Sequence, residues 1–204
     1  MEGLTFRKAT PGDTERIADI MHGEPGPEAV AIAGCVEAAR AFGVGLVRLP
    51  NSPYGWQCSS VAEAEGRVVG VLQTAASSTE IQVTPRLALL ALRTFGVGII
   101  SVLPRLRARQ RVALSPPGET YHISELHVDP RLRGQGIGGA LLDFAEQEAR
   151  AAGFTQMSLA TTTSNPARRL YERHSFRVVE TRSDRAYERY TGIAGRLLMV
   201  KELS

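Results

Sequence analysis

The stretch RLRGQGIGGALL (Arg131–Leu142) decides the fold of this chain. Its glycines fit the G-x-G-x-x-G pattern of dinucleotide-binding loops through Gly134, Gly136 and Gly139. They also fit R-x-x-G-x-G, a pyrophosphate loop of a different fold, if the pattern begins at Arg133. Both loops hold a diphosphate, so the residues around the stretch have to decide between them.

The composition bounds the class of protein. The chain has 204 residues, of which 43% are hydrophobic and 22% charged, and this fits one domain over residues 1–204. A net charge of +3 gives weak support for a nucleic-acid partner, and we expect none, whereas it suits an anionic cofactor. Cys35 and Cys58 have neither metal-site nor disulfide spacing, so we expect reduced thiols, no metal and a cytoplasmic protein.

One apolar stretch could suggest a membrane segment. Leu87–Leu103 contains Arg93 and is bounded by Arg86 and Pro104, so it falls short of the about 20 apolar residues that a spanning helix needs. The N-terminal residues lack a basic segment followed by an apolar run, so no signal peptide is expected. We therefore expect no membrane partner and interpret the stretch as an apolar helical insertion.

Hydrophobic periodicity and turn residues predict an alternation of strands and helices. Strands are expected at residues 4–10, 61–65, 67–73, 121–128, 156–162, 176–181 and 196–202. Helices are expected at residues 13–21, 28–42, 137–152 and 166–174, with a long loop over 43–55. Residues 79–115 are rich in Leu and Arg and are expected to be a helical insertion. The order predicts an α/β fold (α+β mixed sheet), because both a hairpin and crossovers occur.

The dinucleotide interpretation of the glycine loop meets two obstacles. Its first glycine should follow a buried strand directly, but Asp129–Arg133 separates the strand from Gly134. An acid should follow about 20 residues later to hold a ribose, and Ser158–Thr162 contains none. The ATP-binding loop is excluded as well, because no Lys-Ser or Lys-Thr follows the glycines.

The pyrophosphate interpretation accounts for more of the residues. A strand leads into a glycine turn, and a helix begins at once near Ile137. Glycines have no Cβ atom, so the free N–H groups of the helix N-terminus can approach a diphosphate closely, aided by the helix dipole. Arg133 and Arg131 supply positive charge. A glycine-rich surface turn with solvated arginines is the alternative.

Two motifs carry a resemblance to a known family. ELHVDPRLRGQGIGGALL (residues 125–142) and SNPARRLYERHSF (residues 164–176) resemble the GCN5-related N-acetyltransferases, abbreviated GNAT. The resemblance covers about residues 120–181 and is thin over 1–75. It implies the GNAT acyl-CoA N-acyltransferase fold, with residues 79–115 added to the minimal fold.

The resemblance also implies a cofactor site. In this family acetyl-CoA lies in a V-shaped opening between two parallel strands, here 121–128 and 156–162, and no metal takes part. The residues that match the family's cofactor positions are Leu126, His127, Val128, Arg133, Gly134, Gln135, Gly136, Ile137, Gly138, Gly139, Asn165, Arg168 and Tyr171. Asn165 has an alternative role as a helix cap before Pro166.

The same resemblance implies catalytic candidates. Tyr171 occupies the family's L-Y position and is the candidate acid for the leaving thiolate, since a phenol is protonated at neutral pH. The base that deprotonates the amine is Glu125 or, as the second candidate, His122, with a water chain left open. Strict alternation along a strand would put Glu125 and His122 on opposite faces. Ser175 stands where the family usually has glycine, which leaves the local turn open.

The acceptor cannot be read from the sequence. We expect a small-molecule or peptide amine, and a homodimer is compatible with the chain. Four arginines alternate in PRLRARQRV (residues 104–112), and we expect the insertion to be a lid or wall of the acceptor pocket. Its alternatives are an interface between copies or a surface for an acidic partner. The alternative function is a non-catalytic acyl-CoA-binding sensor or scaffold of the same fold.

Overall fold

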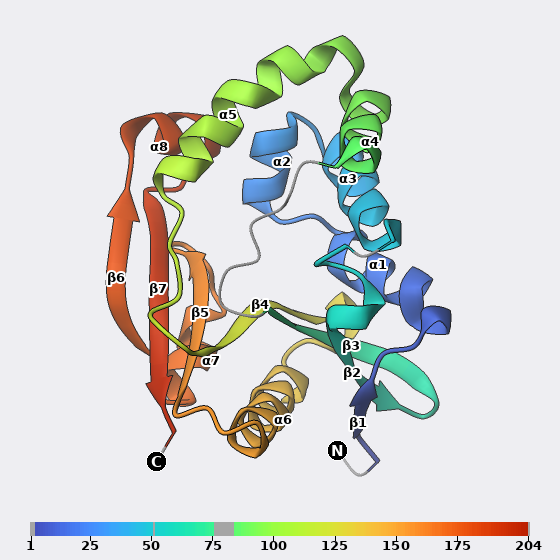
Figure 1. Cartoon of the computed structure of the whole chain (residues 1–204), viewed down its shortest axis with the longest axis vertical. Helices are drawn as coiled ribbons and strands as arrows, with labels where there is room; N and C mark the ends of the chain where they lie inside the picture. Colours follow the sequence, from blue (N-terminus) through green and yellow to red (C-terminus); the bar gives the residue numbers. More distant parts are fainter. Residues whose placement is uncertain (1–2, 51, 76–83, 204) are drawn as a thin grey trace.

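A seven-stranded sheet runs through the molecule in the order β1-β2-β3-β4-β5-β7-β6 (Figure 1). The computed structural model describes residues 3–50, 52–75 and 84–203. The strands are β1 (Thr5–Lys8), β2 (Ser59–Ala64), β3 (Arg67–Ala75), β4 (Tyr121–Val128), β5 (Gln156–Thr162), β6 (Arg177–Ser183) and β7 (Gly195–Glu202). β4 and β5 are parallel and the other neighbours are antiparallel, so the predicted mixed sheet is confirmed.

Helices lie on both sides of the sheet (Figure 1). They are α1 (Thr14–His22), α2 (Pro27–Ala33), α3 (Val36–Arg48), α4 (Pro85–Phe95), α5 (Ile99–Arg111), α6 (Ile137–Ala151), α7 (Arg168–Arg173) and α8 (Arg185–Thr191). α6 lies below the sheet in this view, whereas α1 to α5 lie above it. α5 passes across the top of the molecule from α4 to α8.

Two apolar clusters hold these helices to the sheet. Leu72 belongs to the cluster that α6 covers, where it is buried with Leu141. Its neighbour Val71 belongs to the cluster that α1 covers, where it is buried with Ile17. Successive residues of β3 thus serve opposite faces, as the two-residue repeat of a strand requires. Each such side chain contributes about 1.5–3 kcal/mol by leaving water.

The region predicted as one helix and a long loop is two helices. α2 ends at Gly34, whose φ of 98° stops it, and Cys35 then caps α3 by accepting from the N–H of Ala38. α3 continues to Arg48, through the glycines that predicted a loop from residue 43. A Cβ atom at Gly43 would lie 2.4 Å from Nδ1 of His22. That glycine therefore serves the close packing of α3 on α1, and the predicted loop is wrong over residues 43–48.

The helix α8 was absent from the sequence prediction. Asp184 caps it by accepting from the N–H of Tyr187 at 2.8 Å, and Gly192 ends it with a φ of 70°. Tyr187 is fully buried against Ala108 and Val112 of the α5 end. The cap and the terminal glycine were both visible in the sequence, but the helix has only seven residues and hardly a full apolar repeat.

The segment expected to be an insertion contains α4 and α5, joined by a 3-10 turn at Gly96–Gly98. Residues 79–83 of that segment lie outside the described part of the chain. α4 rests on α3, where the rings of Phe42 and Phe95 are 5.2 Å apart. α5 rests on α8 through its C-terminal end. The segment is therefore packed on the protein at both ends, and the junction between α4 and α5 protrudes from the surface.

The close packing at Gly43 makes a stability prediction. We expect Gly43→Ala to lower the free energy of unfolding by about 1–2 kcal/mol, because overpacking against the His22 ring outweighs the gain in helix propensity. Gly98→Ala is the matched control, since a Cβ atom there meets open space. Urea unfolding of the three proteins measures both effects. A Gly43→Ala protein as stable as the control would contradict the packing argument.

Candidate active site

The sheet opens between β4 and β5. The two strands are paired only through Tyr121–Ile123 and Met157–Leu159. Beyond Ile123, the edge of β4 that faces β5 has no strand partner in the described structure, and Figure 1 shows the two strands diverging. This is the V-shaped opening that the family resemblance implies. Unpaired backbone groups at such an edge can bind an extended ligand as an additional strand would.

A β-bulge decides which side chains of β4 share a face. Glu125 is paired with Gln73 and Ile123 with Thr74, so Ser124 is an extra residue in β4. Its hydroxyl donates to the carbonyl of Gln73 at 3.1 Å. The alternation is therefore interrupted at this position.

The bulge corrects the predicted placement of the two candidate bases. Ile123 and Leu126 both pack into the cluster that α6 covers, although they are three residues apart. Glu125 pairs with Gln73 and His122 with Ala75, two residues that share one face of β3. Glu125 and His122 thus lie on the same face of the sheet, and the predicted placement on opposite faces is wrong.

Glu125 has a histidine partner. His127 donates from Nε2 to Oε2 of Glu125 at 2.8 Å. Burial opposes the ionisation of Glu125, but the hydrogen bond from His127 and then the charges of its neighbours, with Arg196 the smallest of them, outweigh burial and lower the pKa of the carboxyl. The side chain of Glu125 nevertheless keeps 36% of its surface accessible. It is an ionised carboxylate, surrounded by protein and still within reach of a small molecule.

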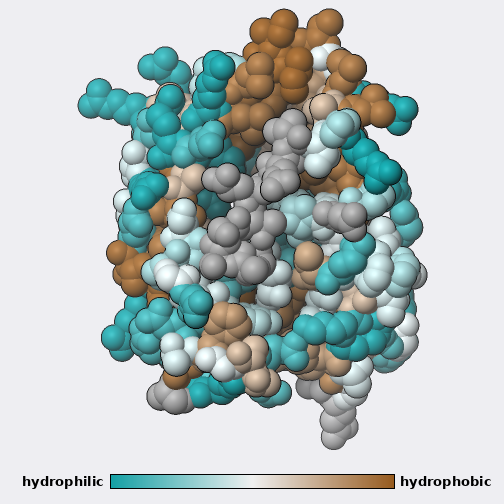
Figure 2. Space-filling model, in the orientation of Figure 1, coloured by the Kyte–Doolittle hydropathy of each residue, from teal (hydrophilic) through white to brown (hydrophobic). Residues whose placement is uncertain are grey.

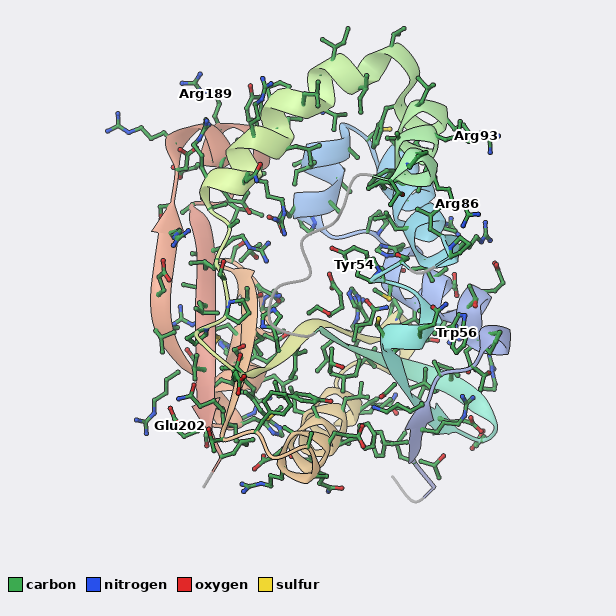
Figure 3. The ribbon with its side chains drawn as sticks, viewed as in Figure 1. Tyr54, Trp56, Arg86, Arg93, Arg189 and Glu202 are labelled. Carbon is green, nitrogen blue, oxygen red and sulfur yellow. The ribbon has the colours of Figure 1, made fainter. Side chains whose placement is uncertain are left out.

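His22 and Tyr54 complete what we call the Glu125 cluster, which consists of Glu125, His127, His22 and Tyr54. His22 comes from the end of α1, and burial lowers its pKa to about 4. Its Nε2 atom is buried and has no hydrogen-bond partner in the described structure. Figure 3 places Tyr54 between α2 and β4, and burial and the charge of Glu125 raise its pKa. Three segments distant in sequence thus supply two imidazoles, a phenol and a carboxylate.

A second, partly buried carboxylate lies on α2 and shares Arg196 as a neighbour with Glu125. Glu28 accepts from the hydroxyl of Tyr187 at 2.7 Å and from Nη1 of Arg196 at 2.6 Å, and Nε of Arg109 is 3.6 Å away. Burial raises the pKa of Glu28, but the two guanidinium groups outweigh burial and lower it. Because these partners come from α8, β7 and α5, Glu28 fixes the upper helices over the sheet.

The sequence did not indicate His22, Tyr54 or Glu28. Each is a single polar residue in a segment without a catalytic motif. Tyr54 lay in the predicted loop, and Glu28 looked like an acid in the first turn of a helix. Only the fold brings them together, so no local signal could have identified them.

His122 is engaged at the closed end of the opening. Its Nδ1 atom lies 2.9 Å from Oγ of Ser158, which in turn lies 2.8 Å from Oγ1 of Thr120. Burial lowers the pKa of His122 to about 4. It sits where β4 and β5 are still paired, whereas Glu125 lies beyond the last pair. The geometry therefore favours Glu125 over His122 as the group that faces a substrate.

The glycine loop has the conformation of an anion site. Gly134 and Gly136 have φ values of 78° and 86°, which only glycine adopts easily. No side chain caps α6, and the N–H groups of residues 134–139 donate to no described residue. Asp129 anchors the loop by accepting from the N–H of Arg131 at 3.0 Å and from the guanidinium of Arg16. With Arg133 and Gln135 exposed beside these N–H groups, the loop fits a pyrophosphate.

The last two glycines of the stretch have a packing role. A Cβ atom at Gly138 would lie 3.1 Å from Leu170, and one at Gly139 would lie 3.1 Å from Nε2 of His174. Both contacts are with residues of α7 or its end. These glycines therefore let α6 and α7 approach each other, next to the loop that the first two glycines form.

Tyr171 is placed by α7. It is only 7% exposed, and its ring lies edge-to-face on Phe176 at 6.3 Å. Burial, with a smaller effect of the Glu125 charge, raises its pKa to about 12. The phenol is therefore protonated at neutral pH, as an acid requires.

The other residues of the second motif are held by local contacts. Oδ1 of Asn165 accepts from the N–H of Ala167 at 2.9 Å and so closes the turn before α7. It is not the N-cap itself, because α7 begins only at Arg168, with Ala167 as its N-cap. The side-chain amide of Asn165 donates to Oγ1 of Thr161 at 2.7 Å and ties the turn to β5. Arg168 is paired with Glu172 at 2.7 Å. Ser175 has a φ of 66°, so it adopts the left-handed turn that glycine would make without strain.

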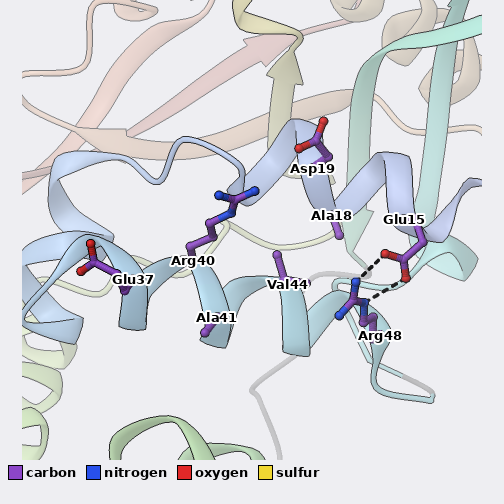
Figure 4. A pocket seen from close by; sticks show the side chains of 8 residues that line it. All are labelled: Glu15, Ala18, Asp19, Glu37, Arg40, Ala41, Val44 and Arg48. Atoms are coloured by element: carbon purple, nitrogen blue, oxygen red, sulfur yellow. Dashed lines mark hydrogen bonds and ion pairs between the residues drawn. The ribbon is translucent and has the colours of Figure 1, made fainter.

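A groove of about 470 Å³ lies elsewhere, between α1 and α3 (Figure 4). It is lined by Glu15, Ala18, Asp19, Glu37, Arg40, Ala41, Val44 and Arg48. Arg48 donates to Glu15 at 2.9 Å, and both side chains are more than half exposed, so the pair adds little stability. None of the lining residues belongs to the Glu125 cluster or the glycine loop.

Comparison with known proteins identifies the class. The sequence model described as "Acetyltransferase (GNAT) family" matches residues 47–176, more than half of the chain. The chain therefore belongs to the GNAT acetyltransferase family, whose members use acyl-CoA. No curated protein sequence matches it significantly.

Solved structures agree on the fold. A mosquito arylalkylamine N-acetyltransferase like 5b is 17% identical with a TM-score of 0.61, over 98% of this chain and 100% of that one. A Drosophila melanogaster polyamine N-acetyltransferase is 22% identical with a TM-score of 0.57, over 98% and 100%. The PaiA N-acetyltransferase of Thermoplasma acidophilum, solved with coenzyme A, is 13% identical with a TM-score of 0.58, over 98% and 99%. At these identities the likeness establishes the GNAT fold.

The two buried histidines predict a pH dependence of stability. An unfolded histidine has a pKa near 6.5, and His22 and His122 have pKa values of about 4 in the fold. Their neutral forms are favoured, so stability is complete above pH 6.5 and is lost as the pH falls from 6.5 toward 4. We expect each histidine to cost roughly 1–2 kcal/mol of unfolding free energy between pH 7 and pH 5.

Urea unfolding at pH 7 and pH 5 measures this loss. His22→Gln and His122→Gln should each reduce the difference between the two pH values, whatever they do to stability at pH 7. His174→Gln changes a histidine outside the Glu125 cluster and serves as the control. A pH dependence that is the same in all four proteins would rule out the burial argument.

Proposed function

We propose that this protein is an N-acetyltransferase that moves the acetyl group of acetyl-CoA to a primary amine by direct attack in a ternary complex. The observation that carries the proposal is the position of Glu125. It lies on β4, where this strand diverges from β5. The glycine loop with its free N–H groups follows the end of the same strand. An acid–base group and a diphosphate site thus meet at one opening of a sheet that belongs to the GNAT family.

The reaction joins the amine nitrogen to the acetyl carbon and breaks the carbon–sulfur bond of the thioester. One proton must leave the amine and one must reach the sulfur. Acetyl-CoA, when bound, supplies the activated acyl group. In this proposal Glu125, oriented by His127, receives the proton of the amine directly or through water. Tyr171 supplies the other proton, and the N–H groups near Val128 stabilise negative charge on the carbonyl oxygen.

The acceptor class is the finer part of the proposal. The Drosophila enzyme is described as forming N-acetylagmatine, and the mosquito protein is named for arylalkylamines. Agmatine and arylalkylamines are small primary amines, so this class is the first to test. The Glu125 cluster adds a carboxylate with an accessible side chain, which suits an amine as a hydrogen-bond donor.

The glycine loop predicts a binding defect. We expect wild-type protein to bind acetyl-CoA, and Arg133→Glu combined with Gly136→Asp to weaken binding at least tenfold, since two negative charges would face the diphosphate. Gly153→Asp is the matched control, because Gly153 also has a left-handed φ, 82°, and open space around it. Calorimetry with acetyl-CoA and with NADH measures both ligands. Binding of NADH but not acetyl-CoA by folded protein would overturn the proposal.

Glu125 predicts a catalytic defect. We expect Glu125→Gln to lower kcat roughly 10²- to 10⁴-fold with nearly unchanged affinity for acetyl-CoA, because it removes a base and keeps the side-chain volume. His122→Gln should lower kcat less than tenfold, since His122 lies at the closed end of the opening. Release of free thiol with a panel of small amines measures turnover. Tight acetyl-CoA binding without turnover on any amine would favour the non-catalytic sensor.

A further inference from the structure

The middle of the α4–α5 segment exposes apolar side chains that no described residue covers. Val97 is 91% exposed, Ile100 74% and Leu92 61%. We call the apolar corner the set of exposed residues on this segment, which are Leu89, Leu92, Val97, Ile100, Leu103 and Leu106. Figure 2 shows them as the large hydrophobic surface at the top of the molecule. Contiguous apolar surface of this kind marks an interaction site.

The apolar corner is not the core of a helix bundle. By length and composition the run Pro85–Arg111 is apolar enough to cross a membrane, which corrects the expectation that it falls short, yet almost none of its apolar stretch is buried in the protein. The chain turns between α4 and α5 at Gly96, whose φ is 51° (Figure 1). Both helices are docked on the protein, at Phe95 and at Ala108. The segment is thus a protruding corner and not a straight spanning helix.

The charged side chains on the segment that carries the corner have one sign. The sequence has no acid between Glu80 and Glu119. Arg86, Arg93 and Arg107 are exposed and form no ion pair with a described residue. Figure 3 shows Arg86 and Arg93 pointing outward from α4. A protruding apolar corner is therefore bordered by unpaired guanidinium groups.

We infer that the apolar corner docks on a membrane surface that carries anionic headgroups. The apolar side chains enter the boundary between headgroups and acyl chains, and the arginines pair with phosphates. Each basic side chain near an anionic surface strengthens the attraction to it. The expectation of no membrane partner considered only whether a helix could span the membrane. Docking on the membrane surface requires only a short apolar corner with basic side chains beside it. The inference does not depend on the proposed reaction.

A second copy of the chain fits this surface less well. A symmetric dimer through the corner would bring Arg86, Arg93 and Arg107 of two molecules together, without an acid on the segment to neutralise them. The corner is also protruding, so two copies would touch over a small area. A bilayer adapts to a protruding shape and supplies the opposite charge.

Vesicle co-sedimentation tests the apolar part. We expect wild-type protein to pellet with phosphatidylglycerol–phosphatidylcholine vesicles and much less with phosphatidylcholine alone. Val97→Asp combined with Ile100→Asp should lower the bound fraction at least tenfold. Val179→Asp is the control, since Val179 is an apolar residue on β6 with 56% exposure. All substitutions are at exposed positions, and circular dichroism checks that each variant is folded.

The same assay tests the charges. Arg86→Glu combined with Arg93→Glu should weaken binding to the anionic vesicles, and 0.5 M salt should weaken wild-type binding. Arg67→Glu, at the exposed first residue of β3, should have little effect.

Two results would overturn the inference. One is wild-type protein that stays in solution with anionic vesicles, or corner variants that pellet as wild type does. The other is a wild-type dimer that the Val97→Asp and Ile100→Asp changes dissociate, without any vesicle binding, which would assign the corner to a second copy.

Discussion

The divergence of β4 and β5 after three residue pairs is the constraint on which this structure depends. Two parallel strands in one sheet would normally satisfy each other's backbone groups along their whole length. Here the pairing stops at Ile123, and the edges beyond it face an opening. Both the glycine loop and Glu125 lie on the β4 side of that opening, so the diphosphate site and the acid–base group are set at a fixed separation by one strand.

The bulge at Ser124 then selects what faces the opening. Without it, Glu125 and Ile123 would share the apolar face that α6 covers, and a carboxylate would be buried among leucines. With it, Leu126 returns to the apolar face, and Glu125 joins His127 and His22 on the other. A bulge depends on the register of the neighbouring strand, which a single sequence does not reveal. That is why simple alternation misplaced His122 relative to Glu125.

The sequence predicted what local chemistry determines. The bounds of β4 and β5, the glycine turn between β4 and α6, and the start of α6 all follow from short-range patterns. Glycine was misinterpreted at position 43, where it predicted a loop. Gly43 lies inside α3, and its role is to let that helix pack closely on His22. His22, Tyr54 and Glu28 are likewise brought together by the fold alone. Positions fixed by a long-range contact could not be predicted, and neither could the seven-residue helix α8, whose local cap and terminal glycine frame too short an apolar repeat.

The charges around Glu125 bear on how an amine would react there under the proposed function. Glu28 is paired with the guanidinium groups of both Arg196 and Arg109, whereas Glu125 has His127 as its hydrogen-bond partner and only a minor effect from Arg196. His22 is neutral at pH 7. The carboxylate of Glu125 therefore stabilises a bound ammonium ion, while burial disfavours the same charge. Because these two effects oppose each other, binding alone does not deprotonate the amine, and the reaction needs a base such as Glu125 to take the proton directly or through water.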